Sequence, residues 1–371
     1  MVKTKLQEFR EQTNTVLQNR WLFDCLSDDR SRTALYAELR AQDFPTLRLK
    51  SLLRSGGSQA PWPQEDLYFV TRRGDIEQAL RHYSVEPYHS LDSGGRFMLG
   101  LDDPATHDPQ RAIAAQALAF PAPEIQACAA QAWYRASLLP LKKFEFDLVT
   151  EIAEQAGVRF LQLLFGLPVE AVVALRILMR GTYTRLSFQI IGRHFVSDSG
   201  LPPSGSARVK ELKDVLDEAI EEAKLARTEQ RLIDKGLPEE NVIARLDKLY
   251  PNSLSNDAAM VALGLMAGTI GNVTAGVAIA IQHFFDGPDR IEAARRAARE
   301  DTREAALEEK PEPKAQRLHE GRLRKLVEEA FLHHTPAAFL ARTATQQPLL
   351  STTQGGRERP VPAGAHVLVA M

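Results

Sequence analysis

The sequence predicts a mainly α-helical fold with small β-sheets. The first observation is the stretch Asp257–Asp286, which carries no formal charge from Ala258 to Gln282 and is apolar or small on every face. A helix of this kind is typical of the middle of a core. The second observation is that apolar residues after Pro109 recur at helical spacing between proline and glycine breaks. Strand-like runs are few and short.

The composition is that of a globular protein without a strong charge. The 371 residues are 44% hydrophobic and 25% charged, and the formal net charge is −2. This balance gives no electrostatic reason to expect a nucleic-acid partner or an anionic membrane surface. The N-terminus is polar, and Cys25 and Cys128 give neither a disulfide framework nor metal-ligand spacing. We therefore expect a cytoplasmic protein.

The N-terminal part predicts helices around a first sheet. Residues 1–30 form a predicted helical lead-in, in which Trp21, Leu22 and Phe23 are an apolar patch able to dock on the body. The main body is predicted as one domain over residues 31–371. Its first elements are a helix at 31–42, strands at 47–53 and 67–71, a helix begun by Gly74 with Asp75 as its cap, and an irregular stretch at 84–100.

The remainder is predicted as helices followed by two strands. The expected helices cover 147–165, 171–196, 207–235, 257–286, 289–299 and 321–334. The strands are expected at 339–345 and 367–370.

The middle of the long apolar helix is unusual. Gly268, Gly271 and Gly276 interrupt it, and each costs about 1 kcal/mol relative to alanine in a helix. Glycine lets another body approach the backbone closely, and Asn272 and Thr274 place polar groups where burial is costly without a partner. The pattern favours a helix that forms the wall of a site for a flat ligand.

Two other interpretations of this helix remain. It can be a plain buried helix with incidental glycines, or a single membrane span, for which Gly264 and Gly268 supply a GxxxG pair. The stretch is rich in alanine and glycine, and no basic cluster or aromatic belt flanks it. We therefore expect no membrane span.

From about residue 30 to its end, the chain resembles the bacterial-type cytochromes P450. The matching segments occur in the family's order: LYFVTRRGDIEQAL at 67–80, LGLDDPATHDPQRAI at 99–113, FDLVTEIAEQAGVRFLQLLFGLP at 146–168, LSNDAAMVALGLMAG at 254–268, LVEEAFLHHTPAAFLARTATQ at 326–346 and VPAGAHVLVAM at 361–371. The resemblance implies a P450-like fold in which 257–286 is the family's helix I and 321–334 its helix K.

The resemblance also implies a haem (heme) cofactor. In the family, a His-x-x-x-Arg pair and an arginine in the strand after helix K hold the haem propionates, and His107, Arg111 and Arg342 match these positions. Four-residue spacing puts His107 and Arg111 on one face of a helix. On its own, His107 can equally be a surface or capping histidine.

Helix I departs from the family pattern. The oxygen-activating acid and threonine of the family would follow Ala267 and Gly268, and Ile270 and Gly271 stand there instead. A shift of register to Gly271 places Val273 at the acid and Thr274 at the alcohol. The acid is missing in both registers, which predicts an impaired proton relay to dioxygen.

Asn272 points to a different chemistry on the same helix. The Gly271-Asn272 pair is similar to P450s that rearrange peroxides, in which an amide hydrogen-bonds the peroxide oxygens. Asn272 and Thr274 are therefore the catalytic candidates, and Ala267, Gly268 and Gly271 are expected to line the distal side of the haem. The alternative for Asn272 is a buried amide satisfied by backbone or water.

The C-terminal part departs further. The family's Glu-x-x-Arg would have Glu329 as its acid, but position 332 is leucine, so Glu329 is expected to need another partner or a proton. The chain stops at Met371, before the family's haem-binding loop with its cysteine ligand. Neither Cys25 nor Cys128 lies in a similar motif, so no axial ligand is recognisable. The last core helix of the family is also absent, which predicts an uncovered apolar surface on 257–286.

Two functions follow from the resemblance. The first is a haem-thiolate oxidoreductase, either a monooxygenase with a redox partner or a hydroperoxide-rearranging enzyme without one, acting on a small apolar or lipid-like substrate. As this truncated chain it is expected to be inactive. The second is a non-catalytic binding or partner module that uses the P450 scaffold without haem.

Overall fold

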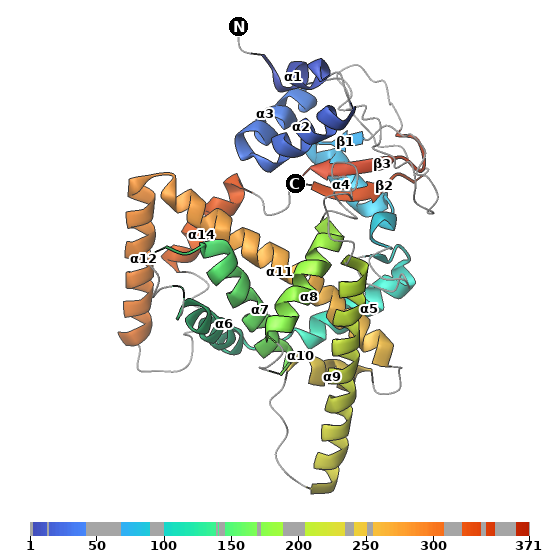
Figure 1. Cartoon of the computed structure of the whole chain (residues 1–371), viewed down its shortest axis with the longest axis vertical. Coiled ribbons are helices and arrows are strands. Elements are labelled where there is room, and N and C mark those ends of the chain that lie inside the picture. Colours follow the sequence, from blue (N-terminus) through green and yellow to red (C-terminus); the bar gives the residue numbers. More distant parts are fainter. Residues whose placement is uncertain are drawn as a thin grey trace. The chain divides into compact units, whose positions relative to one another are not determined.

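The computed structural model of the chain describes residues 3–12, 15–41, 68–89, 100–138, 140, 145–168, 172–187, 205–233, 241–250, 255–307, 321–334, 339–345 and 361–370. These residues form mostly helices and one three-stranded sheet (Figure 1). The chain divides into two compact units built from distant segments. Unit 1 comprises Met1–Pro109, Arg180–Glu211 and Ala337–Met371, and unit 2 comprises Gln110–Met179 and Leu212–Pro336.

Unit 1 begins with a cluster of three helices, α1 (Lys5–Glu11), α2 (Thr15–Ser27) and α3 (Asp29–Arg40). Their shared core consists of buried side chains from all three helices: Leu6, Phe9, Leu22, Cys25, Leu26, Leu35, Tyr36 and Leu39. The ring of Trp21 packs on that of Phe9, with centroids 5.7 Å apart. Two members of the predicted apolar patch, Trp21 and Leu22, are therefore engaged within the helix cluster itself.

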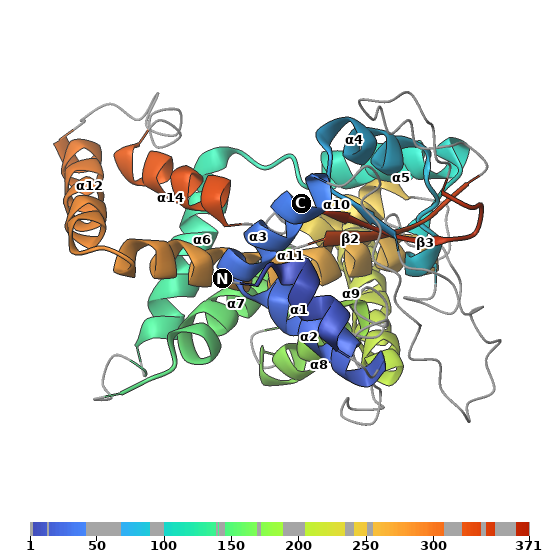
Figure 2. The ribbon, with the colours of Figure 1, turned by 90° about the horizontal axis from the view of Figure 1, so that it is seen from above.

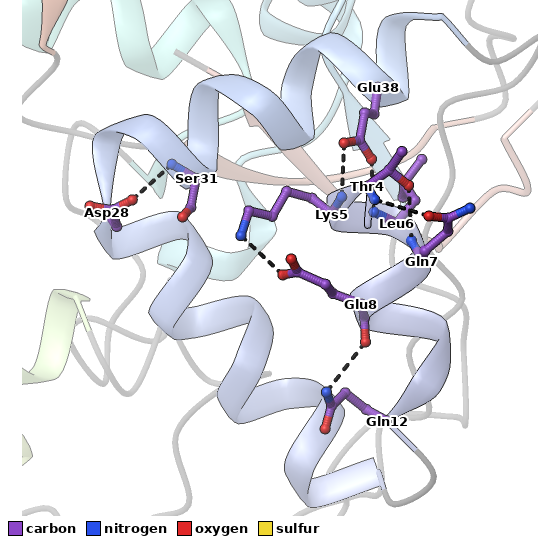
Figure 3. Close-up of polar contacts among 9 residues, drawn as sticks. All are labelled: Thr4, Lys5, Leu6, Gln7, Glu8, Gln12, Asp28, Ser31 and Glu38. Carbon is purple, nitrogen blue, oxygen red and sulfur yellow. Dashed lines mark hydrogen bonds and ion pairs between the residues drawn. The ribbon is translucent and has the colours of Figure 1, made fainter. Parts of the chain in front are cut away.

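Side-chain caps fix the starts of α1 and α3. Thr4 accepts a hydrogen bond from the backbone nitrogen of Gln7, whose side chain accepts one from the nitrogen of Thr4, which is a capping box. Asp28 caps α3 by accepting from the nitrogen of Ser31 at 2.8 Å. Figure 3 shows these contacts and a further one, in which the Glu38 carboxylate of α3 reaches the first turn of α1.

The sheet of unit 1 has the strand order β1-β3-β2, with β1 (Tyr68–Val70) parallel and β2 (Phe339–Thr343) antiparallel to the central β3 (His366–Ala370). Every residue of β3 is buried. Helix α4 (Arg73–His82) packs against β1 and β3 (Figure 1). The three strands confirm those predicted at 67–71, 339–345 and 367–370, and the strand predicted at 47–53 lies outside the described residues.

The predicted cap of α4 is wrong. The helix begins at Arg73 and its N-cap is Arg72, so Asp75 lies inside the first turn. There its charge complements the positive end of the helix. Asp75 is also buried, and this burial raises the pKa of its carboxyl.

The rest of the chain forms one short helix of unit 1, η1 (Glu86–Tyr88), and the helices that build or enter unit 2. These are α5 (Pro104–Ala117), α6 (Ala122–Ser137), the π-helical η4 (Leu148–Ala153), α7 (Glu154–Phe165), α8 (Val172–Thr184), α9 (Gly205–Ile233), α10 (Val242–Leu249), α11 (Ser255–Phe285), α12 (Pro288–Leu307) and α14 (Arg322–His333). The helices predicted at 257–286 and 321–334 are thus confirmed as α11 and α14.

Helix α7 ends where a glycine is required. Gly166 follows it with φ 73°, a left-handed conformation that a side chain would strain. A Cβ on Gly166 would also lie 2.3 Å from the side-chain nitrogen of Asn241. Asn241 in turn caps α10, accepting from the nitrogen of Ala244 at 2.8 Å. One glycine therefore lets the end of α7 meet the start of α10.

Helix α11 is the central helix of unit 2. It packs against α7, α10, η4, α12 and α14, and Figure 2 shows α12 and α14 beside one of its ends. Its first half is almost completely buried, at Ala258, Ala259, Met260, Val261, Ala262, Leu263, Met266 and Ala267. The sequence prediction of a helix without a solvent face holds for this half.

The second half of α11 is more open. Its apolar residues are mostly only part-buried, and Phe285 is exposed. By length and composition α11 could cross a membrane, a test that the core helix of a water-soluble protein also passes. Neighbouring helices pack on α11 along its length, as expected of a core helix.

Candidate functional site

Two of the predicted haem-edge residues lie on α5. Asp103 precedes the first residue of this helix and accepts two hydrogen bonds from it. Its side chain accepts one from the backbone nitrogen of Ala105 at 3.0 Å, and its backbone carbonyl accepts one from the backbone nitrogen of His107 at 2.8 Å. His107 is half-buried, with its Nδ1 2.9 Å from the Asp108 carboxylate. Arg111 follows one turn later and is exposed. The helical spacing of His107 and Arg111 is as the sequence predicts.

Arg342 is held differently, on β2. Its terminal nitrogen donates to the carbonyl of Ala341 at 2.8 Å, and its guanidinium carbon lies 5.8 Å from the centroid of the Tyr88 ring. Its Nε is buried and has no hydrogen-bond partner among the described residues. A part-buried cation with a buried, unused donor is suited to a carboxylate, because ionised pairs form the strongest hydrogen bonds.

Tyr88 is a neighbour that the sequence did not predict. Its hydroxyl accepts from the backbone nitrogen of Ala341 at 3.2 Å. Burial raises the pKa of Tyr88, and the nearby Arg342 cation opposes that rise. The phenol therefore stays neutral, and its hydroxyl holds β2 at Ala341, the residue before Arg342.

A polar network ties the segment before Tyr88 to the sheet. Ser84 and Thr343 exchange two backbone hydrogen bonds of 2.9 Å, and the Thr343 hydroxyl donates to Glu86 at 2.9 Å. Asp102 accepts from the Ser84 hydroxyl at 2.5 Å and from the Val85 nitrogen at 2.6 Å. Several of these contacts join residues far apart in the sequence, so no local sequence pattern predicts them.

The structure does not join the three haem-edge candidates. Among the described residues of unit 1, no hydrogen bond or ion pair links Arg342 to His107. Arg111 belongs to unit 2. The convergence of all three on one anionic edge therefore stays a prediction.

The distal candidates lie at the midpoint of α11. Ala267 is buried, and Gly268 and Gly271 are half-buried. A Cβ added to Gly268 would meet no atom of the described residues within 4 Å, so space adjoins the backbone within the described part of the chain. A Cβ on Gly276 would lie 3.2 Å from the ring of Phe331. The body that approaches Gly276 is therefore a side chain of α14.

The two polar candidates on α11 differ in their hydrogen bonding. The exposed Asn272 amide donates to the carbonyl of Gly268 at 2.6 Å. The Thr274 hydroxyl is buried and has no hydrogen-bond partner among the described residues. The Thr274 hydroxyl is therefore available to hydrogen-bond a ligand, whereas the Asn272 amide is already bonded to its own helix. Their catalytic roles stay predictions.

The two cysteines do not resemble iron ligands. Cys25 lies in the core of the α1–α3 cluster, where burial raises the pKa of its thiol to about 12. Because a metal ligand must be the thiolate, Cys25 is unsuited to that role. Cys128 is half-buried on α6. Among the described residues, no group of three or more His, Cys, Asp or Glu side chains could hold a metal ion.

The expected difficulty at Glu329 does not arise. Glu329 is exposed on α14, so water solvates its charge in place of a partner. Leu332, which stands where the family has arginine, is 86% exposed. The prediction that Glu329 needs a protein partner or a proton is therefore wrong.

Comparison with known proteins points to one fold. No protein-family profile and no curated sequence matches the chain. Among solved structures it is similar to the ligand-free P450 monooxygenase TamI, with a TM-score of 0.62, 18% identity, and 92% of this chain and 72% of that one covered.

Other similar structures are of the same kind. The open cytochrome P450 Eryk from S. erythraea matches with a TM-score of 0.60 and 16% identity over 93% of this chain and 74% of that one. P450BioI, in complex with an acyl carrier protein that bears hexadec-9Z-enoic acid, matches with a TM-score of 0.59 and 14% identity over 90% of this chain and 76% of that one. The TM-scores of these three matches establish a shared fold. The chain therefore has the cytochrome P450 fold, as its sequence segments predicted.

Proposed function

We propose that the chain forms the scaffold of a P450-type oxidoreductase that takes a small apolar or lipid-like substrate, with haem as its cofactor. The observation that carries the proposal is the likeness of nearly the whole chain to a P450 monooxygenase, 92% of it at a TM-score of 0.62. The apolar central helix α11, with open space beside Gly268, supports an apolar ligand.

Arg342 supports the haem part of the proposal. Haem carries two propionates, and Arg342 has a buried Nε without a partner among the described residues. A propionate oxygen would satisfy this donor and neutralise the cation. His107 and Arg111 are proposed to bind the same edge, although His107 would have to exchange Asp108 for the propionate.

Thiolate ligation of the iron does not fit the two cysteines of this chain, Cys25 and Cys128. A haem iron with a thiolate ligand supplies O–O bond cleavage to enzymes of this fold. The neutral, buried thiol of Cys25 cannot ligate iron without opening the α1–α3 core. We therefore expect this chain to bind haem without thiolate ligation and to show no oxidative turnover by itself.

On α11, Thr274 is proposed as the hydroxyl that hydrogen-bonds a bound oxygen or hydroperoxide. Its buried, unpartnered Oγ1 supports this role. No acid stands next to it in the sequence, which favours a hydroperoxide substrate over a dioxygen pathway that needs proton delivery. Asn272 is proposed as a second donor, which requires its amide to leave the Gly268 carbonyl.

The proposed partners follow from this choice. A dioxygen pathway requires a redox partner, and a peroxide pathway requires none. P450BioI was solved with an acyl-loaded carrier protein, which makes an acyl chain a sensible first substrate class to test. We propose a cytoplasmic location, since the similar structures are bacterial P450s and α11 packs as a core helix.

A second candidate function is a binding module that uses the scaffold without haem. The burial of Cys25 and the internal hydrogen bond of Asn272 favour it, because both remove groups that haem chemistry would use. Such a module would still bind an apolar molecule beside α11.

Haem titration separates the two functions. The purified chain is titrated with haemin and followed by absorbance, and then reduced and exposed to carbon monoxide. The oxidoreductase proposal expects one haem per chain, and at least tenfold weaker binding in Arg342→Ala. The exposed Arg73, which pairs with Glu77 on α4, supplies the control Arg73→Ala with unchanged affinity.

The outcomes are distinct. Stoichiometric haem without a thiolate-type Soret band agrees with the proposal for this chain. A thiolate-type band would overturn the statement on Cys25 and Cys128. No haem binding would leave the binding module, which a fluorescent fatty acid then tests directly.

A further inference from the structure

Two histidines meet where α11 and α14 end. His283 lies in the last turn of α11 and is only 3% exposed, and His334 is the half-buried C-cap of α14. Their ring centroids are 5.6 Å apart, with 67° between the ring planes. Both residues belong to unit 2, and Figure 2 shows the two helices packed together.

The packing of the two helices produces this pair. Phe331 lies against Gly276, where the absence of a side chain lets α14 approach α11 closely. His283 follows Gly276 by about two helical turns and so shares its face. His334 follows Phe331 by about one turn, and its backbone nitrogen still bonds the helix at Ala330. The contact that seats Phe331 therefore also places the imidazoles opposite each other.

We propose that His283 and His334 form a two-imidazole binding site for a divalent transition-metal cation of the Zn²⁺ class. With Zn–N bonds of about 2.0–2.1 Å in tetrahedral geometry, the centroids of two imidazoles on one ion lie roughly 5 Å apart. The observed separation is 5.6 Å. The separation of the two rings is therefore close to the one that a shared ion requires, and binding would turn one nitrogen of each ring toward the ion in exchange for its present contacts.

The donor set decides which cations suit the site. Neutral imidazole binds Zn²⁺, Cu²⁺, Ni²⁺ and Co²⁺, whereas Ca²⁺ and Mg²⁺ require oxygen ligands. No third His, Cys, Asp or Glu among the described residues completes the cluster. Water would fill the remaining positions from the side of the half-buried His334.

A bound ion would link the ends of α11 and α14. A cation that binds the folded chain and has lower affinity for the unfolded chain raises its stability by mass action. The link would act on the helix pair whose outer residues, Phe285 and Leu332, are strongly exposed. The site is independent of the haem proposal, since none of its residues belongs to the haem-edge or distal candidates.

The test measures metal binding by the full chain, with any affinity tag of histidines removed. Isothermal titration with ZnCl₂ is expected to give one ion per chain, and thermal unfolding is expected to shift upward with ZnCl₂ but not with MgCl₂. His334→Ala is expected to weaken Zn²⁺ binding at least tenfold and to abolish the thermal shift. His89→Ala, at an exposed histidine of unit 1, is the matched control and should leave both unchanged.

A spectroscopic arm covers the case in which a buried substitution such as His283→Ala disturbs folding. Cu²⁺ added to the wild type should show electron-spin couplings to two equivalent nitrogens, and His334→Gln should leave one. Unchanged Zn²⁺ affinity in His334→Ala would overturn the proposal, as would the absence of binding by the wild type. Loss of binding in His333→Ala, with binding kept in His334→Ala, would also overturn it.

Discussion

Arg176 on α8 and Glu154 at the start of α7 form a two-point ion pair inside unit 2. Nε and a terminal nitrogen of Arg176 lie 3.2 and 3.3 Å from the two carboxylate oxygens, and the same terminal nitrogen donates to the carbonyl of Thr150 at 2.8 Å. Glu154 is only 7% exposed. One guanidinium therefore joins α8, α7 and the π-helical η4.

Removal of this guanidinium should be costly. Arg176→Ala leaves the Glu154 carboxylate buried without its cation, and breaking such a pair costs about 3 kcal/mol. Urea unfolding followed by circular dichroism measures the change in the free energy of unfolding. Arg295→Ala breaks the exposed pair with Glu292 and should cost less than about 0.5 kcal/mol. Equal losses in both variants would contradict the assigned role of burial.

The sequence predicted the elements better than the contacts between them. The bounds of α11 and α14 and the strand positions follow from periodicity and breakers, which act locally. The pairing of Arg342 with Tyr88 and the seating of Phe331 on Gly276 join residues from distant parts of the chain. No periodic signal reports such contacts, so they were not predicted.

Errors at single residues have specific causes. Asp75 was assigned as a cap because capping residues favour helix starts, yet α4 begins before it and its N-cap, Arg72, makes no side-chain capping bond. The resemblance predicts that Glu329 needs another partner or a proton, but Glu329 lies on the exposed face of α14. The resemblance to the family thus predicted the position of α14 correctly but the surroundings of the Glu329 side chain incorrectly.

Gly268 and Gly276 provide a matched pair of substitutions on α11. Gly268→Ala adds a methyl group into open space, so it should stabilise the fold by about 1 kcal/mol through helix propensity. In Gly276→Ala the methyl group meets the Phe331 ring at 3.2 Å, which should cancel much of that gain. Thermal unfolding compares the two variants.

Ligand binding is a second measurement that distinguishes Gly268→Ala from Gly276→Ala. If the open space beside Gly268 is part of a ligand site, Gly268→Ala should weaken haem or fatty-acid binding although it stabilises the fold. Gly276→Ala should leave that binding unchanged, because Phe331 already occupies its space. Equal effects of both variants on binding would contradict the placement of the site.

Glu38 should control the first turn of α1. Its two carboxylate oxygens accept from the backbone nitrogens of Lys5 and Leu6, each at 2.8 Å (Figure 3). Glu38→Ala leaves these amides without acceptors and removes a negative charge from the helix N-terminus, at a cost of about 1–2 kcal/mol. Hydrogen exchange should accelerate at Lys5 and Leu6, whereas Glu77→Ala on α4 should leave their exchange unchanged.

Cys25 should make the protein less stable in alkali. Burial raises the pKa of its thiol from 9.0 to about 12, so between these pH values the folded chain keeps a proton that the unfolded chain has lost. The contribution of Cys25 to the free energy of unfolding is therefore fully present below pH 9. It falls by about 1.4 kcal/mol for each pH unit as the pH rises toward 12. Tyr36, whose pKa is also raised by burial, adds to the fall above pH 10.

Urea unfolding at several alkaline pH values measures this slope. Cys25→Ala lowers stability at every pH because it leaves a small cavity, but its slope above pH 9 should be shallower than that of the wild type by the contribution of one thiol. Cys128→Ala, at the half-buried cysteine of α6, should keep the wild-type slope. Parallel curves for Cys25→Ala and the wild type would mean that the thiol ionises in the folded chain as readily as in the unfolded chain, which would contradict the effect of burial on its pKa.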